Sequence, residues 1–157
     1  MCNCQTIRII YILCFFFLLL LITKINATPS IEITSFPPYG ETGEISGRVH
    51  GVDPAAHSAA LYIFIEGSGW WTKPAFDAPL IPIGQDSTWQ AQMTSGEVDR
   101  FATQVRVFVI PAGVLIPIAA GFACLPDTLE QISVAAASVL RQPPAIRFAG
   151  YDWYVKN

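Results

Sequence analysis

Apolar and polar residues alternate with a period of two through most of the chain after residue 28. Between residues 44 and 50, for example, polar side chains alternate with Ile45, Gly47 and Val49, which is typical of a strand with one buried face. Related patterns, separated by Gly, Pro and Asp turns, predict further strands at 30–36, 59–66, 79–83, 88–93 and 102–110. The sequence therefore predicts a mostly β fold, an immunoglobulin-like β-sandwich of about seven strands.

One segment near the C-terminus has a different period. Between Asp127 and Arg141 the apolar residues have the spacing of a helical stripe, at Leu129, Ile132, Ala136, Val139 and Leu140. Asp127 and Glu130 have the form of a capping box, and the prolines at 143–144 would end a helix. We therefore expect one inserted α-helix over 127–141, lying against a sheet edge or an end of the sandwich, and then a last strand over 145–156.

The first 27 residues have the pattern of a secretory signal peptide. Arg8 precedes an uninterrupted apolar run of fourteen residues from Ile9 to Ile22, and the small residue Ala27 follows. A membrane span needs about twenty apolar residues, so this run favours a cleaved leader over an anchor. We expect a secreted or periplasmic domain of residues 28–157. The alternative is an uncleaved leader, which would then be the chain's contact with a membrane.

The composition of residues 28–157 excludes several classes of function. This part carries seven basic and twelve acidic residues, a net charge of −5, which does not suit nucleic acid as a partner. Its length is that of one domain. Three of the four cysteines lie in the leader, so Cys124 has no partner for an intramolecular disulfide. The apolar neighbours of Cys124 predict a buried, unreactive thiol.

No arrangement of residues points to catalysis. His50 and His57 lack the spacing of a zinc site. The segment 67–69, Gly-Ser-Gly, is typical of a turn and lacks the pattern of a nucleophile elbow. Hydrolysis of glycosidic bonds needs two converging carboxylates. The acidic residues here stand singly, at Asp53, Glu66, Asp77, Asp86 and Asp99. We therefore predict that the protein is not an enzyme and needs no metal or other cofactor.

The segment best suited to binding is 69–74, Gly-Trp-Trp-Thr-Lys-Pro. Neighbouring tryptophans on a strand point to opposite sides, so one ring can enter the core while the other faces outward. An exposed indole offers a flat apolar face on which a sugar ring can stack, and a lysine beside it can donate a hydrogen bond. The candidate ligand-binding residues are therefore Trp70, Trp71 and Lys73. The alternative is that both rings close the open end of the sandwich.

The final segment, residues 150–157, is rich in aromatic side chains. Its alternation allows a last strand of this domain, or an exposed edge that pairs with another chain. The candidate interaction residues on this strand are Tyr151, Trp153 and Tyr154.

Several stretches together resemble a bacterial secreted immunoglobulin-like module. They are GEISGRVHGVDPAAHSAALYIFIEG, GWWTKPAFDAPLIPI, STWQAQMTSGEVDRFATQVRVFVIP and IRFAGYDWYVKN. In its longer relatives the module looks like an N-terminal domain ahead of a laminarinase-like (family sixteen) glycoside hydrolase domain, and a segment similar to FAGYDWYVKN begins that second domain. The resemblance therefore also allows residues 150–157 to be the start of a second domain. The carboxylate cluster that carries hydrolysis in that family has no matching position in this sequence.

The resemblance implies a non-catalytic accessory module associated with carbohydrate, with a polysaccharide, a neighbouring domain or another protein as its partner. Two alternatives stay open. One is a structural or adhesive protein that pairs through its C-terminal aromatic strand. The other is the remnant of a secreted glycoside hydrolase.

Overall fold

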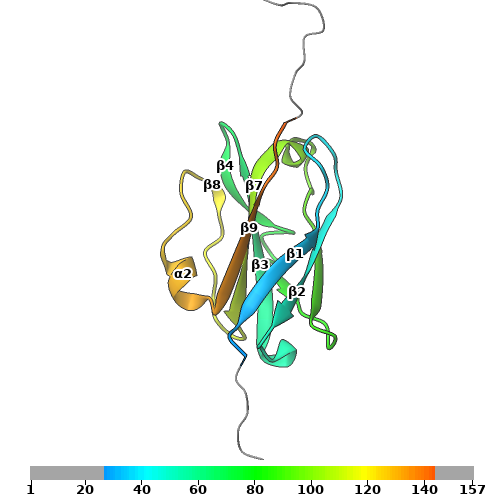
Figure 1. Cartoon of the computed structure of the whole chain (residues 1–157). Helices are drawn as coiled ribbons and strands as arrows, with labels where there is room; N and C mark the ends of the chain where they lie inside the picture. The colour runs from blue at the N-terminus through cyan, green and yellow to red at the C-terminus, as the bar shows by residue number, and fades with distance from the viewer. Residues whose placement is uncertain (1–26, 144–157) are drawn as a thin grey trace, which may run out of the picture.

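The computed structural model describes residues 27–143, which form a β-sandwich with a short helix on one side (Figure 1). The predicted signal peptide lies outside the described residues except for Ala27. The predicted last strand also lies outside them, and with it the candidate interaction residues Tyr151, Trp153 and Tyr154.

Nine antiparallel strands in the described range form two sheets. The smaller sheet has the order β1–β2–β6, with β1 at Ser30–Ser35, β2 at Glu44–His50 and β6 at Thr88–Gln92. The larger sheet has the order β8–β4–β3–β7–β9, and β5 also pairs with β3. Its strands are β3 at His57–Ile65, β4 at Gly69–Lys73, β5 at Leu80–Pro82, β7 at Ala102–Pro111, β8 at Ala120–Phe122 and β9 at Ala135–Leu140. The helical turns are η1 at Pro54–Ala56, η2 at Glu97–Phe101 and α2 at Thr128–Ile132.

The alternating apolar residues meet between the two sheets, as the sequence predicts. The smaller sheet contributes Ile45, Val49 and Trp89, and the larger sheet contributes residues of β3 and β7. On β7 the inward residues are Val105, Val107 and Val109. The predicted sandwich is thus confirmed, with nine strands rather than about seven.

The larger sheet is also buried on its other face. The chain between β7 and β9 covers this face with the segment before β8 and with α2 and the residues leading into it (Figure 1). Tyr62, Trp70 and Phe108 pack there against Leu129 of α2. The Tyr62 hydroxyl donates a hydrogen bond of 2.8 Å to the carbonyl of Pro117, and burial raises its pKa. Two buried faces explain why β3 is apolar without interruption from Ala59 to Ile65.

The predicted helix over 127–141 is wrong beyond its first turns. The helix α2 ends at Ile132, and β9 follows as an edge strand paired with β7. The capping box does not form either, because Asp127 makes no side-chain cap and Glu130 pairs with Arg106. The residues facing inward from β9, Ala135, Ala137 and Val139, pack against the core as a strand. For residues 135–140, pairing with the edge of β7 is therefore more favourable than the helix that their apolar spacing predicts.

The prediction of a buried Cys124 is also wrong, because its side chain is exposed. Cys124 lies in the connection between β8 and α2, on the outside of the covering segment. Its neighbours Phe122 and Ala123 are exposed as well, so apolar flanking residues did not indicate burial here.

Arg141, directly after β9, joins three parts of the chain at one end of the sandwich. Its Nε donates to the carbonyl of Pro37 at 2.8 Å, and one Nη donates to that of Ala102 at 3.1 Å. The other Nη donates to the carbonyls of Pro38 and Glu41. The side chain is buried, which lowers the pKa of the guanidinium. This buried cation thus holds the β1–β2 loop to the end of β9.

Candidate functional site

The residues of the predicted binding segment form β4, and its pairing with β3 decides where each side chain points. Trp71 lies opposite Ile63, and Lys73 lies opposite Leu61, so both face the inside of the sandwich. Trp70 faces the other way, toward the segment that contains α2. The prediction that neighbouring tryptophans point to opposite sides is therefore confirmed.

Trp70 is a core residue. Its side chain is only 8% exposed, and its ring lies 5.3 Å from that of Phe64 between ring centres. It belongs to the apolar cluster beneath the covering segment. This burial leaves no open ring face on which a ligand could stack.

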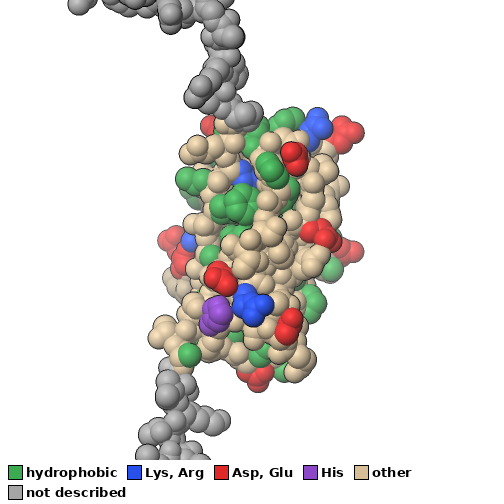
Figure 2. Space-filling model, turned by 45° about the vertical axis from the view of Figure 1, so that its right-hand side comes forward, with side chains coloured by type: hydrophobic (Ala, Val, Ile, Leu, Met, Phe, Trp, Pro, Cys, Tyr) green, Lys and Arg blue, Asp and Glu red, His purple; other side chains and the backbone are tan. Residues whose placement is uncertain are grey.

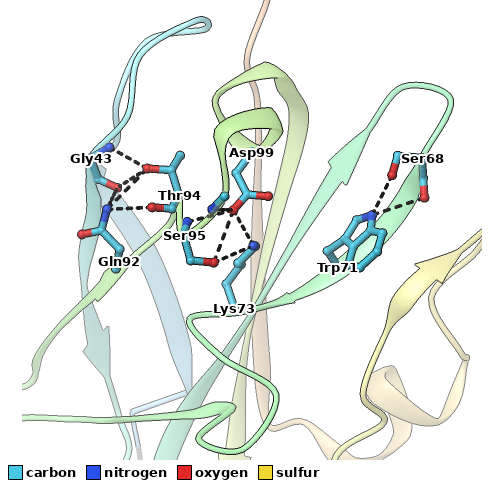
Figure 3. Close-up of polar contacts among 9 residues, drawn as sticks. Gly43, Ser68, Trp71, Lys73, Gln92, Thr94, Ser95 and Asp99 are labelled. Atoms are coloured by element: carbon cyan, nitrogen blue, oxygen red, sulfur yellow. Dashed lines mark hydrogen bonds and ion pairs between the residues drawn. The ribbon is translucent and has the colours of Figure 1, made fainter.

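Trp71 lies at the border of the core and is half-buried. Its indole N–H points at the β3–β4 turn, where the Ser68 carbonyl accepts at 3.2 Å and the Ser68 hydroxyl at 3.1 Å (Figure 3). The ring is nearly parallel to that of Phe76, with an angle of 12° between the planes and 6.3 Å between the centres. Phe76 is 48% exposed. We call these two rings the Trp71–Phe76 pair.

The structure places Lys73 in a buried ion pair instead of beside a ligand. Lys73 is 7% exposed, and its Nζ lies 2.5 Å from Oδ2 of Asp99 (Figure 3). Nζ also donates to the hydroxyl of Ser95 at 2.9 Å. The same Asp99 oxygen accepts from the backbone N–H groups of Ser95 and Gly96 at 2.8 and 2.7 Å. All donors of this cluster thus converge on one carboxylate oxygen.

The environment keeps Asp99 ionised. Burial on its own would raise the pKa of this carboxyl. The hydrogen bond from Lys73, those from the N–H groups of Gly96 and Ser95, and the charge of Lys73 outweigh burial and hold the pKa below its usual value. The hydroxyl of Ser95 thus accepts from Nζ of Lys73 and donates to Oδ2 of Asp99 at 3.3 Å, which completes the cluster.

The sequence alone did not reveal this cluster. In the sequence Asp99 is one of several isolated acidic residues, because its partner Lys73 lies 26 positions away. The sequence contains one weak indication of this cluster. If β4 is recognised as a strand, Lys73 falls on its buried face, and a buried lysine needs a negative charge beside it.

The histidines do not form a metal site. His50 lies 3.6 Å from Glu32, measured from Nε2 to Oε1, and Nδ1 of His57 lies 2.9 Å from the carbonyl of Asp53. Among residues 27–143, no three His, Cys, Asp or Glu side chains come close enough to bind a metal ion together. No helix in the same range is long and apolar enough to cross a membrane.

Comparison of the chain with protein-family models, with curated proteins and with solved structures finds no match in any of the three. The resemblance to the module of laminarinase-like hydrolases therefore stays a prediction from sequence.

Proposed function

We propose that the protein is a non-catalytic, exported β-sandwich module that binds polysaccharide through the Trp71–Phe76 pair. The observation that carries the proposal is the parallel arrangement of these two rings at the border of the core, where Trp71 is half-buried and about half of Phe76 is exposed. A sugar ring presents C–H groups on its faces, and such a face stacks on an aromatic ring that water can reach.

Two features prepare the Trp71–Phe76 pair for such a role. The hydrogen bonds from the Trp71 indole to Ser68 orient that ring, so Trp71 loses little side-chain freedom on binding. Asp77 directly follows Phe76 and is exposed, so its carboxylate can accept hydrogen bonds from sugar hydroxyls next to the rings. Trp71 and Phe76 then provide the apolar contact, and Asp77 provides polar contacts beside it.

Affinity electrophoresis in gels that contain soluble β-glucan, mannan or xylan tests the proposal. Phe76→Ala removes the exposed ring without removing a core side chain, and we expect it to weaken binding about tenfold. Phe101→Ala is the matched control, since Phe101 is partly exposed at the end of η2, where its ring contacts Tyr39 and not Trp71 or Phe76. Equal migration of wild type and Phe76→Ala in every gel would contradict the proposal.

A further inference from the structure

A polar groove lies on the outer face of the smaller sheet. The side chains of Ser46 and Arg48 on β2 alternate with buried residues and therefore point outward, as do Thr88 and Gln90 on β6. Ser46 lies directly opposite Gln90, and Arg48 lies opposite Thr88. Together with Thr34 and the segment 82–84 they line a groove of about 680 Å³. This volume is in the range of small-molecule binding sites.

The lining residues offer hydrogen-bonding groups of every kind that a sugar hydroxyl can use. Hydroxyl groups come from Thr34, Ser46 and Thr88, and an amide comes from Gln90. The Thr34 hydroxyl donates to the Ser46 carbonyl, that of Thr88 to Asp86, and the Gln90 amide nitrogen to Glu44, so the oxygens of these groups are left to accept from a ligand. Within residues 27–143 the guanidinium of Arg48 has no ion-pair or hydrogen-bond partner, whereas those of Arg106 and Arg141 are engaged. The N–H groups of Arg48 can therefore donate hydrogen bonds to a ligand at one end of the groove.

The charges around the groove favour a neutral ligand. Glu32 lies opposite Arg48 on β1. Hydrogen bonds from Thr88 lower the pKa of Asp86, and the charge of Arg48 adds a smaller contribution in the same direction. Figure 2 shows a basic side chain, acidic side chains and a histidine gathered on one part of the surface, next to a broad area of uncharged groups. The nearby carboxylates oppose an anion at Arg48.

The wall formed by residues 82–84 adds an apolar contact. Pro82 is exposed, and its ring presents C–H groups beside the polar floor. Sugar rings have the same combination of apolar faces and a polar rim. We propose that this groove is a second binding site, which takes a neutral polyhydroxylated chain such as an oligosaccharide. The ligand class is that of the proposed function, but the site uses different residues on a different sheet.

Titration of the ¹⁵N-labelled protein with neutral hexasaccharides of β-1,3-glucan, β-1,4-glucan, mannan and xylan tests the proposal by NMR. We expect amide shifts at residues 46–48, 82–84 and 88–90 with at least one of these sugars. Arg48→Ala and Gln90→Ala should each weaken that binding at least fivefold. His50→Ala, on the same face of β2 but outside the groove, should leave it unchanged.

The two binding proposals fail separately in this experiment. Shifts only around residues 68–77 would overturn the groove and leave the proposed function standing, whereas shifts only in the groove would do the reverse. Shifts in the groove with oligoglucuronate or sulfate, but with none of the four neutral sugars, would also overturn the groove proposal, because its ligand would then be an anion. No shift with any probe would overturn both.

Discussion

The indole of Trp89 occupies the space that a side chain at Gly47 would need. These two residues face each other across β2 and β6, and a Cβ added to Gly47 would lie 2.5 Å from Cζ2 of Trp89. The same Cβ would also meet the backbone carbonyl of Glu32 on β1. A glycine in the middle of a strand is thus explained by the large ring beside it.

Gly47→Ala should therefore lower the free energy of unfolding by about 3 kcal/mol, because neither the Trp89 ring nor the β1 backbone can move without disturbing the core. Urea denaturation measures the change. Gly96→Ala is the control, since a Cβ there would come no closer than 3.5 Å to another atom. Similar losses in both variants would show that the contact with Trp89 does not set the requirement for glycine.

Removal of one partner of the buried ion pair should be costly. Asp99→Ala leaves the ammonium of Lys73 buried without its counter-charge, and we expect a loss of about 3 kcal/mol of stability. The double variant Lys73→Met, Asp99→Ala removes both charges and should recover part of the loss. A double-mutant cycle based on denaturant unfolding measures the coupling between the two residues. Strictly additive effects would contradict the ion-pair interpretation.

The same carboxyl should make stability depend on pH in the acidic range. The pKa of Asp99 is lower in the folded protein than the value of about 3.9 for an unfolded chain, so the folded state binds its proton less readily. Its contribution to stability is present above pH 4 and is lost as the pH falls through the folded-state pKa.

Thermal unfolding between pH 6 and pH 2 tests this prediction. Asp99→Asn should flatten the fall in stability below pH 4. It should not abolish that fall, because hydrogen bonds from Thr88 also lower the pKa of Asp86. Parallel curves for wild type and Asp99→Asn would contradict the assignment.

Arg141→Lys should destabilise the protein although it keeps the charge. An ammonium cannot reach the carbonyls of Pro37, Ala102 and Glu41 in the directions that the guanidinium uses. We expect a loss of about 2 kcal/mol, because buried carbonyls lose their donors. Arg100→Lys, at an exposed cation next to Phe101, is the control and should change stability by less than about 0.5 kcal/mol. Equal stability of the two variants would argue against a role for the Arg141 contacts.

Much of the fold could be predicted because burial of one sheet face leaves a clear period in the sequence. The strand β2 has the predicted bounds, and β7 differs by one residue at its end. The strand β9 could not be predicted, since alanine favours helices and its spacing fits both periods. Its state depends on pairing with β7, about thirty residues earlier in the chain.

The candidate site could be predicted only in part, for the same reason. The alternation of side chains along a strand correctly predicts that Trp70 and Trp71 point to opposite faces of the sheet, because the orientation of neighbouring side chains depends only on the local backbone. The burial of Lys73 depends on η2, which returns to β4 only after β5 and β6, and the parallel contact of Trp71 with Phe76 depends on how the chain folds back directly after β4. Spacing along the chain carries no information on such contacts.

The path of the chain through the sandwich has a mechanical consequence. Figure 1 shows the described segment entering at one end of the long axis and leaving at the opposite end, with β1 first and β9 last. Tension applied through the two ends therefore pulls along these strands. The hydrogen bonds of β1 to β2 and of β9 to β7 carry the load in shear and must break together, which resists extension far better than unzipping them one by one.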